Sequence, residues 1–366
     1  MAGTYSYEKS RIERLRALMR ENHIDVFLMP PGPNFFYFSG FETESMERLT
    51  LLLVSADSVS LISPKLMEEQ LEKNSWIEDI RSWSDSDNPY RITRNILSRL
   101  KPSMVAIDGS LPYFHYSGLF ERLRVRKILG DNILSTLRLI KDSEELNRIA
   151  SAIDRSERAL KSTVDHISDE ISEKELATVL EDNMIKAGLD RSAFGTIVAS
   201  GQNSSIPHHS PTEMKIKRYE PIVIDFGGRY HGYASDTTRT FFIDRAGPEM
   251  EEIYEVTRNA QESTIKLLNE ESTYGDADRI ARGIIDNKGY GPRFIHRLGH
   301  GLGISVHEEP YLVPDNTKVM EENSVFTIEP GIYIPNKGGV RIEDTVHFDH
   351  GRCIPFNTFS KELNIL

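Results

Sequence analysis

The chain of 366 residues contains one cysteine, Cys353. An internal disulfide is therefore excluded, and with it the framework of a small disulfide-rich secreted domain. No stretch approaches the roughly 18 consecutive apolar residues that read as a membrane helix. The first residues, MAGTYSYEKSRIERL, also lack the apolar segment of a secretory leader. These absences favour a cytoplasmic protein with no membrane partner.

An excess of basic residues is absent as well. The 44 Lys and Arg are outnumbered by 56 Asp and Glu, which gives a net charge of -12. Because duplex binding draws on clustered Lys and Arg, we expect no nucleic acid as a main partner. Residues 1–140 hold 18 residues of each sign, so the whole acidic excess lies in residues 141–366. Surface solubility explains most of this excess, and a site built from carboxylates would add to it.

The length exceeds what one core usually supports, so two domains are expected. The first part alternates helical and strand patterns: SRIERLRALMRENHI is amphipathic, whereas DVFLMP, LTLLLVS and SMVAID are short apolar runs typical of buried strands. This alternation predicts an α/β layer. Near residue 140 the pattern changes to a long helix with Ser143 as its N-cap, followed by helices over residues 172–187 and 249–269.

Two predicted hairpins carry acidic residues at strand positions where an apolar core would have hydrophobic side chains. In IDFGGRYHGYASDTTRTFF, a turn centred on Tyr230 and His231 would place Asp225 directly opposite Asp236. Like charges so paired are destabilising unless a cation neutralises them, although an exposed sheet face would also accommodate both aspartates. In FTIEPGIYIPNKGGVRIEDTVHF, Glu329 and Glu343 oppose each other in the same way.

A glycine-flanked histidine, His300, lies between the hairpins in RLGHGLGISVHEEP. Alone it is a weak signal, because a buried histidine is more often simply hydrogen-bonded. With two Asp and two Glu it forms a ligand set for two divalent ions, which need bridging carboxylates and can hold a hydroxide nucleophile between them. The oxygen-rich set with a single nitrogen suits Mn²⁺ or Co²⁺ better than a structural zinc.

The order and spacing of these five residues resembles that of the pita-bread metallopeptidases, in particular the Xaa-Pro branch of prolidase and aminopeptidase P. The likeness covers residues 141–366, and residues 1–130 resemble the creatinase-type N-terminal domain of that branch. It implies an α+β fold with a smaller α/β domain over residues 1–132 and a pita-bread catalytic domain over residues 133–366. It also implies that one ion is bound by Asp225 and Asp236, the other by His300 and Glu329, with Asp236 and Glu343 bridging and Glu329 as general base.

The resemblance gives meaning to two further histidines. His208, in SGQNSSIPHHSPT, and His307 match substrate-side histidines that would support the scissile carbonyl or the tetrahedral intermediate. Arg341 lies two residues before Glu343 on a strand, so the two side chains point to the same face. Arg341 could form a structural ion pair with the carboxylates or contact the substrate, and both roles are considered. We expect His209 and His231 either at the mouth of the site or behind the residues that line it, and His296 to be structural.

The resulting prediction is a dinuclear metal hydrolase that cleaves before a proline at the second position of a small peptide. The compact length favours a dipeptidase, and an aminopeptidase P acting on longer peptides is the alternative. A homodimer is expected from the resemblance. Four alternatives remain. A methionine aminopeptidase is disfavoured by the N-terminal domain. A metal-free creatinase-like hydrolase and a non-catalytic peptide-binding relative are both disfavoured by the five intact ligand positions, and the fourth alternative is a metal-dependent lyase.

Overall fold

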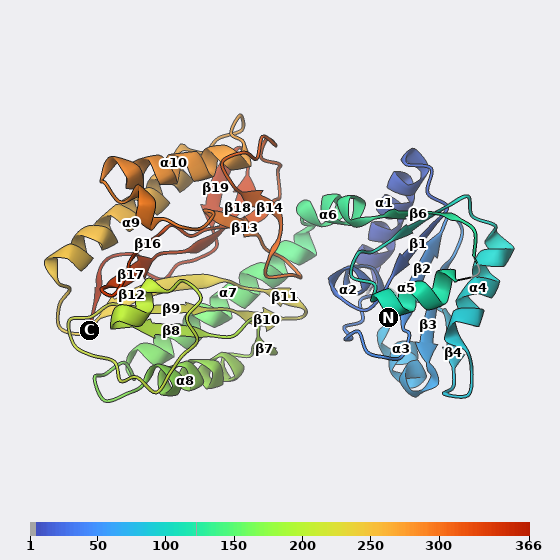
Figure 1. Ribbon diagram of the computed structural model, residues 1–366, viewed down its shortest axis with the longest axis horizontal. Helices are drawn as coiled ribbons and strands as arrows, with labels where there is room; N and C mark the ends of the chain where they lie inside the picture. The colour runs from blue at the N-terminus through green and yellow to red at the C-terminus, as the bar shows by residue number, and fades with distance from the viewer. Residues whose placement is uncertain (1–4, 122) are drawn as a thin grey trace. The chain divides into compact units, whose positions relative to one another are not determined.

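The computed structural model describes residues 5–121 and 123–366, which fold as two compact units. The first unit ends at Arg138 and the second comprises Leu139–Leu366 (Figure 1). Both units mix helices with strands, and this confirms the predicted α+β class. Among the described residues no helix is long and apolar enough to cross a membrane.

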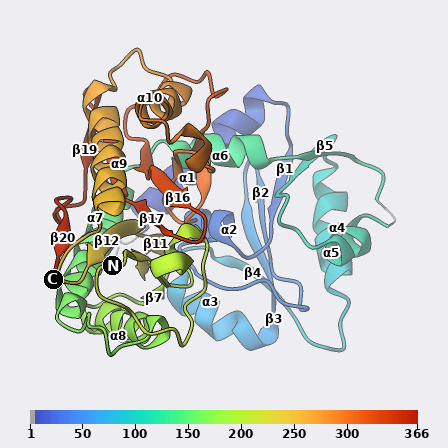
Figure 2. The same ribbon diagram turned by 60° about the vertical axis from the view of Figure 1, so that its left-hand side comes forward.

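The first unit is built on a six-stranded sheet in the order β4-β3-β2-β1-β5-β6. The central strands β1 and β2 are buried at every position because helices cover both faces of the sheet, as Figure 2 shows. The predicted apolar runs are β1, β2 and β5. The elements are α1 (Ser6–Glu21), β1 (Val26–Met29), α2 (Pro33–Ser39), β2 (Leu51–Ser55), β3 (Val59–Pro64), α3 (Glu68–Asn74), β4 (Asp79–Trp83), α4 (Pro89–Leu100), β5 (Met104–Ile107), α5 (Tyr113–Phe120), β6 (Arg126–Leu129) and α6 (Asp131–Leu139).

The second unit places two helix pairs on opposite sides of its strands (Figure 1). The pair α7 and α8 packs on the sheet β20-β12-β9-β8, and the pair α9 and α10 packs on the sheet β14-β13-β15-β18-β19. The helices are α7 (Ser143–Val164), α8 (Glu173–Lys186), α9 (Pro248–Leu267) and α10 (Tyr274–Asn287). The strands are β7 (Arg191–Ser192), β8 (Ile197–Ser200), β9 (Ile222–Phe226), β10 (Gly228–Tyr230), β11 (Tyr233–Ala234), β12 (Thr237–Phe242), β13 (Gly299–Gly301), β14 (Glu308–Leu312), β15 (Val325–Ile328), β16 (Gly331–Ile334), β17 (Gly338–Arg341), β18 (Asp344–Asp349), β19 (Arg352–Pro355) and β20 (Asn364–Ile365).

The three helices predicted in the second unit are present, with one correction at a cap. The N-cap of α7 is Asp142, not Ser143, and its carboxylate accepts a hydrogen bond from the amide of Glu145 at 2.9 Å. The Asp142 amide in turn donates to Glu145 Oε2 at 3.1 Å, so the two residues form a capping box. The helix α10 was not predicted, although Thr273 and Asp276 form the same motif at its start.

The register predicted for the first hairpin is wrong. The ladder pairs Asp225 with Thr238, so Asp225 and Asp236 are diagonal rather than direct neighbours. The turn is formed by His231 and Gly232, whose φ angles of 48° and 84° are both in the left-handed region that a two-residue type I′ turn requires. Because the slip is two residues, both aspartates keep the same facing.

The register predicted for the second hairpin is confirmed. One ladder pairs Ile328 with Asp344, and the next pairs Gly331 with Arg341. Continuing either ladder places Glu329 directly opposite Glu343. These two glutamates therefore lie at the junction between the sheet formed by β15 and β18 and the ribbon formed by β16 and β17.

The two hairpins are joined along β12. The amide of Glu343 donates to the carbonyl oxygen of Thr238 at 3.1 Å, and the Thr240 hydroxyl donates to the carbonyl of Arg341 at 2.9 Å. Beneath this seam the fully buried Arg239 pairs with Asp344 at 2.8 Å and donates to the carbonyl of Glu343. Because a buried ion pair tolerates little displacement, the backbone next to Glu343 is held firmly against β12.

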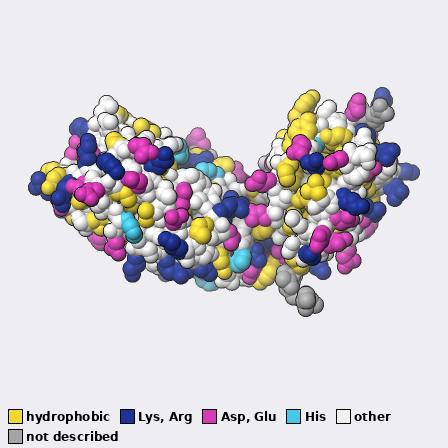
Figure 3. All heavy atoms as spheres, turned by 90° about the horizontal axis from the view of Figure 1, so that it is seen from below, with side chains coloured by type: hydrophobic (Ala, Val, Ile, Leu, Met, Phe, Trp, Pro, Cys, Tyr) yellow, Lys and Arg dark blue, Asp and Glu magenta, His cyan; other side chains and the backbone are white. Residues whose placement is uncertain are grey.

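Charges of both signs are interspersed on the surface of each unit on the face shown in Figure 3. Among the described residues many surface ion pairs join neighbours in one helix, such as that of Arg279 with Asp276 at 2.7 Å in the first two turns of α10. Pairs of this kind contribute little individually, but they shift the titration of the groups involved.

Asp276 gives a pH-dependent prediction. The Thr273 hydroxyl and amide and the Arg279 guanidinium lower its pKa to about 2, below the value of about 3.9 in an unfolded chain. Because the folded-state pKa is the lower one, Asp276 stabilises the fold above about pH 4 and this contribution is lost as the pH falls towards about 2. Replacing Asp276 with Asn should lower the urea midpoint at pH 7, and the difference from wild type should narrow between these two pH values.

The matched control is Asp315→Asn, which removes the same charge from an exposed position. It should leave the midpoint near that of wild type over the same range. A constant difference between Asp276→Asn and wild type across this range would contradict the assignment.

Candidate metal centre

The predicted site residues converge on one pocket of about 620 Å³ in the second unit. Its lining includes all five predicted metal ligands, both predicted substrate-side histidines and Arg341. Four of the five ligands come from the two joined hairpins, and the fifth, His300, comes from β13. The closing of these strands onto one another thus assembles a set whose members are up to 118 residues apart in the chain.

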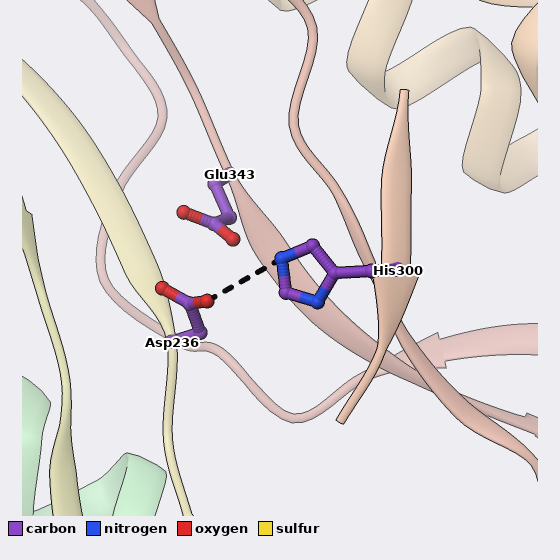
Figure 4. A group of neighbouring side chains, drawn as sticks. All are labelled: Asp236, His300 and Glu343. Atoms are coloured by element: carbon purple, nitrogen blue, oxygen red, sulfur yellow. Dashed lines mark ion pairs between the residues drawn. The ribbon is translucent and has the colours of Figure 1, made fainter. Parts of the chain in front are cut away.

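Three of the predicted ligand side chains form a compact buried group (Figure 4). Asp236, His300 and Glu343 each offer one donor atom, and these atoms lie within 4.8 Å of one another. The three residues are 5%, 2% and 2% exposed. A single cation could therefore contact all three, since ligand atoms on one ion lie at such separations.

Glu329 meets His300 at the same ring nitrogen that lies 3.6 Å from Asp236. Its Oε1 atom is 3.2 Å from His300 Nε2 and accepts a bond from the Thr327 hydroxyl at 3.1 Å. The other ring nitrogen, Nδ1, lies 3.1 Å from the carbonyl of Gly301, which only a protonated nitrogen can bond. Without a cation, Nε2 needs a proton to bond Glu329, and a metal ion at Nε2 would take the place of that proton.

Asp225 is held by Arg341. The guanidinium donates to Asp225 Oδ2 at 2.6 Å, while Asp225 Oδ1 is buried and accepts no hydrogen bond from any described residue. The remaining nitrogens of Arg341 bond the Thr238 hydroxyl, the Tyr333 hydroxyl and the carbonyl of Pro207. This full set of protein partners favours the structural ion pair over the substrate contact as the role of Arg341.

The electrostatics of the cluster show a shortage of positive charge. Burial, and then the neighbouring carboxylates, raise the pKa of Asp236 and of Glu343 well above their ordinary values. Burial also raises the pKa of Asp225, although Arg341 opposes this effect. For Glu329 the bond and charge of His300 outweigh burial and lower the pKa to about 2. Ionising all four carboxylates at once requires cations in addition to His300 and Arg341.

These residues fit divalent metal ions. The orphaned oxygen of Asp225, the three converging donors and the mutual repulsion of the acids each call for a cation at this place. Oxygen donors predominate, and the described residues bring no cysteine to the pocket. A hard or borderline ion suits such a set.

The two predicted substrate-side histidines line the same pocket. The ring of His307 lies 4.1 Å from that of His300, edge to face, and burial followed by the charges of His300 and Arg297 lowers its pKa to about 4. His307 is therefore neutral at pH 7 and can donate one hydrogen bond. His208 is exposed at the pocket and lies close enough for its charge to lower the pKa of both His307 and His296.

The other histidines fall into different environments. His296 lines the pocket but is bonded on both sides, to the carbonyl of Arg297 at 2.7 Å and to the Tyr333 hydroxyl at 3.0 Å. His209 also lines the pocket and bonds Glu173 at 2.9 Å. His231 was expected at the mouth or behind the residues that line the site, but it forms the hairpin turn and is absent from the pocket lining.

The sequence interpretation missed three residues that shape the site. Tyr333 accepts a bond from Arg341 at 2.8 Å and links it to His296. Thr238 donates to Glu343 at 2.7 Å. Arg297 lines the pocket with its guanidinium over the ring of Tyr311 at 4.4 Å. Facing on β12 could have found Thr238, which is two residues after Asp236, whereas no local signal points to Arg297.

Two buried and two partly buried carboxylates, together with a histidine, lie on strands that wall one pocket, and this arrangement is typical of a metal-dependent hydrolase. The comparisons with known proteins agree. The chain belongs to metallopeptidase family M24, whose family model matches residues 147–350, and residues 11–140 match the creatinase/prolidase N-terminal domain. It is thus a metal-dependent peptidase that uses divalent ions.

Individual relatives cover nearly the whole chain. The Xaa-Pro dipeptidase of Pyrococcus furiosus is 36% identical over 339 residues, which is 92% of this chain and 94% of that protein. The structure of a recombinant prolidase from Thermococcus sibiricus matches with a TM-score of 0.93 and 36% identity, covering 100% of both chains. An X-Pro aminopeptidase from Thermotoga maritima matches with a TM-score of 0.87 and 34% identity, covering 97% of this chain and 99% of that one.

Metal removal gives a direct prediction for Asp236. Protein stripped with EDTA should gain thermal stability when Mn²⁺ is added, by about 2.7 kcal/mol at a hundredfold excess over Kd. Asp236→Ala should lose this gain and all peptidase activity, because the remaining acids can no longer hold the ions. Metal content by mass spectrometry and thermal melts would measure both effects.

Asp182→Ala, which removes an exposed acid on α8, serves as the control and should behave as wild type. Full Mn²⁺ content with wild-type turnover in Asp236→Ala would show that Asp236 is not a ligand.

Proposed function

We propose that this chain is an Xaa-Pro dipeptidase with two divalent ions, Mn²⁺ or Co²⁺, in the pocket. Asp225 and Asp236 would hold one ion, His300 and Glu329 the other, with Asp236 and Glu343 between them. When bound, the ions would polarise the scissile carbonyl and lower the pKa of the attacking water. The named relatives and the donor set described above support this assignment.

The protein's own residues would then handle the proton and the developing charge. Glu329 would take a proton from the attacking water and return it to the proline nitrogen as the peptide bond breaks. His307, neutral and accessible, would donate a hydrogen bond to the carbonyl oxygen that becomes negative. His208, in the loop of residues 201–212, would stabilise the same oxygen. Arg341 would keep Asp225 in position rather than touch the substrate.

The observation that carries the choice of a dipeptidase is the presence of Arg297 in the lining of the pocket. A dipeptide ends in a free carboxylate one residue beyond the scissile bond, and Arg is the side chain best suited to bind it. The apolar side chains of Phe194, Ile197, Pro207 and Val306 line the same pocket and suit a proline ring. We also propose a homodimer, from the resemblance to the Xaa-Pro branch, and a cytoplasmic location, from the lone cysteine.

The second candidate is an Xaa-Pro aminopeptidase, which would leave the pocket open beyond the proline. The likeness to the aminopeptidase of Thermotoga maritima favours it. Hydrolysis of Ala-Pro, Ala-Pro-amide and Ala-Pro-Ala by the Mn²⁺-loaded protein distinguishes the two.

The dipeptidase proposal predicts that Ala-Pro is cleaved with a kcat/KM about 10–10² times that of its amide, since a charge-assisted bond is lost. Arg297→Met should raise KM for Ala-Pro by a similar factor and leave the amide unaffected, while Arg297→Lys should restore part of the preference. Equal cleavage of Ala-Pro-Ala would identify the aminopeptidase instead.

His307 provides an independent prediction. His307→Ala should keep its metal content and lower kcat by about 10²–10³, the effect of losing one donor to the transition state. His347→Ala is the matched control, because His347 lies outside the pocket and bonds Asn323. A loss of metal in His307→Ala would move this residue from the substrate side to the ligand set.

A further inference from the structure

Glu173, at the start of α8, is a fully buried carboxylate that the proposed chemistry does not use. Its two oxygens accept hydrogen bonds from two chain segments, residues 200–203 and 209–212, and the Asn203 side chain bonds both oxygens, with Oε2 at 3.2 Å. Oε1 accepts from the Ser200 amide at 2.7 Å, the Ser200 hydroxyl at 3.0 Å and the Asn203 side chain at 3.0 Å. Oε2 accepts from His209 Nε2 at 2.9 Å and from the Thr212 amide and hydroxyl at 3.1 and 2.7 Å.

These two segments are the ends of one loop, and His208 lies inside it. Ser200 ends β8, and Thr212 is further tied to α8 by a bond from the Lys174 amide to its carbonyl at 3.0 Å. One carboxylate therefore closes the loop of residues 201–212 at its base. On the pocket side, Arg341 donates to the carbonyl of Pro207 at 3.3 Å. The backbone on both sides of His208 is thus held by a charged side chain.

The charge state of Glu173 defines the direction of these bonds. Burial opposes its ionisation, but the donors from Ser200, Thr212, His209 and Asn203 outweigh burial and lower its pKa. An ionised carboxylate only accepts, so His209 must donate through a protonated Nε2. Such a charge-assisted bond is stronger than one between neutral groups.

The two adjacent histidines therefore differ in what they can do. His209 has a side chain only 10% exposed, and its Nε2 atom is used by Glu173. His208 is exposed and faces the pocket, where its charge influences His296 and His307. Because His208 and His209 are joined by one peptide bond, a movement of His209 displaces the backbone of His208.

We propose that Glu173 and His209 form a positioning pair that fixes the loop and thereby sets the place of His208 in the pocket. His209 acts through His208 and touches neither substrate nor metal. The proposal rests on the assignment of an Xaa-Pro peptidase for its kinetic test. The structural part, that the pair holds the loop, can be tested without activity.

The kinetic test is a double-mutant cycle on Ala-Pro hydrolysis. His209→Ala should lower kcat by about 10²-fold, the scale of displacing a catalytic group by an ångström. In a His208→Ala background the same change should alter kcat by no more than about twofold, because no positioned group is left. His209→Gln, whose amide can still donate to Glu173, should recover most of the activity.

Hydrogen exchange followed by mass spectrometry measures directly how firmly the loop backbone is held. The amides of residues 206–214 should exchange faster in His209→Ala and Glu173→Gln than in wild type or His209→Gln. Metal content and melting temperature confirm that each variant is folded, and His166→Ala, an exposed histidine after α7, is the control that should change nothing.

Three results would overturn the proposal: equal losses of kcat from His209→Ala in both backgrounds, no rescue by Gln, or unchanged exchange in residues 206–214. If wild type cleaves no Xaa-Pro peptide, the proposed function fails by itself. The exchange measurement then decides the role of the pair alone.

Discussion

The mutual repulsion of four buried carboxylates is the constraint on which the second unit depends. Asp225, Asp236, Glu329 and Glu343 face one another in a pocket where their side chains are largely buried, and this burial makes each charge more costly. An apolar core could not hold them together. The arrangement persists because Arg341 and His300 offset part of the charge and because a set of this kind acquires divalent ions. Folding and metal binding are therefore linked in this unit.

The supports around the acids explain why the site can be both charged and rigid. A continuous series of hydrogen bonds runs from Asp225 through Arg341 and Tyr333 to His296 and the carbonyl next to it. A second branch passes from Arg341 through the hydroxyl of Thr238 to Glu343. Side chains locked in this manner keep ligands within the small tolerance that catalysis needs. Arg341 thus fixes the positions of two carboxylates on different hairpins, Asp225 directly and Glu343 through Thr238.

Sequence reasoning succeeded where the signal was local and periodic. Strand alternation and the turn between Pro335 and Gly339 were enough to place Glu329 opposite Glu343. It failed for the first hairpin because a type I′ turn at His231 and Gly232, rather than the midpoint between the aspartates, defines the register. It could not find Glu173, Arg297 or Tyr333, because their partners are distant in the chain and only the folded arrangement brings them together. The fold class followed from pattern and resemblance, while the loop supports did not.

The shared register of the second hairpin bears on how this protein can change over generations. Glu329 and Glu343 are aligned from one side by β15 and β18 and from the other by β16 and β17. The turn after Ile334 lies outside the first of these ladders, so insertions there leave the alignment of the two acids intact. A single inserted residue between Glu329 and Gly331 would instead shift the register of one ladder relative to the other, so that both could no longer align Glu329 with Glu343. Lineages descended from this chain are free to vary the turn, whereas the few residues beside the glutamates must keep their number.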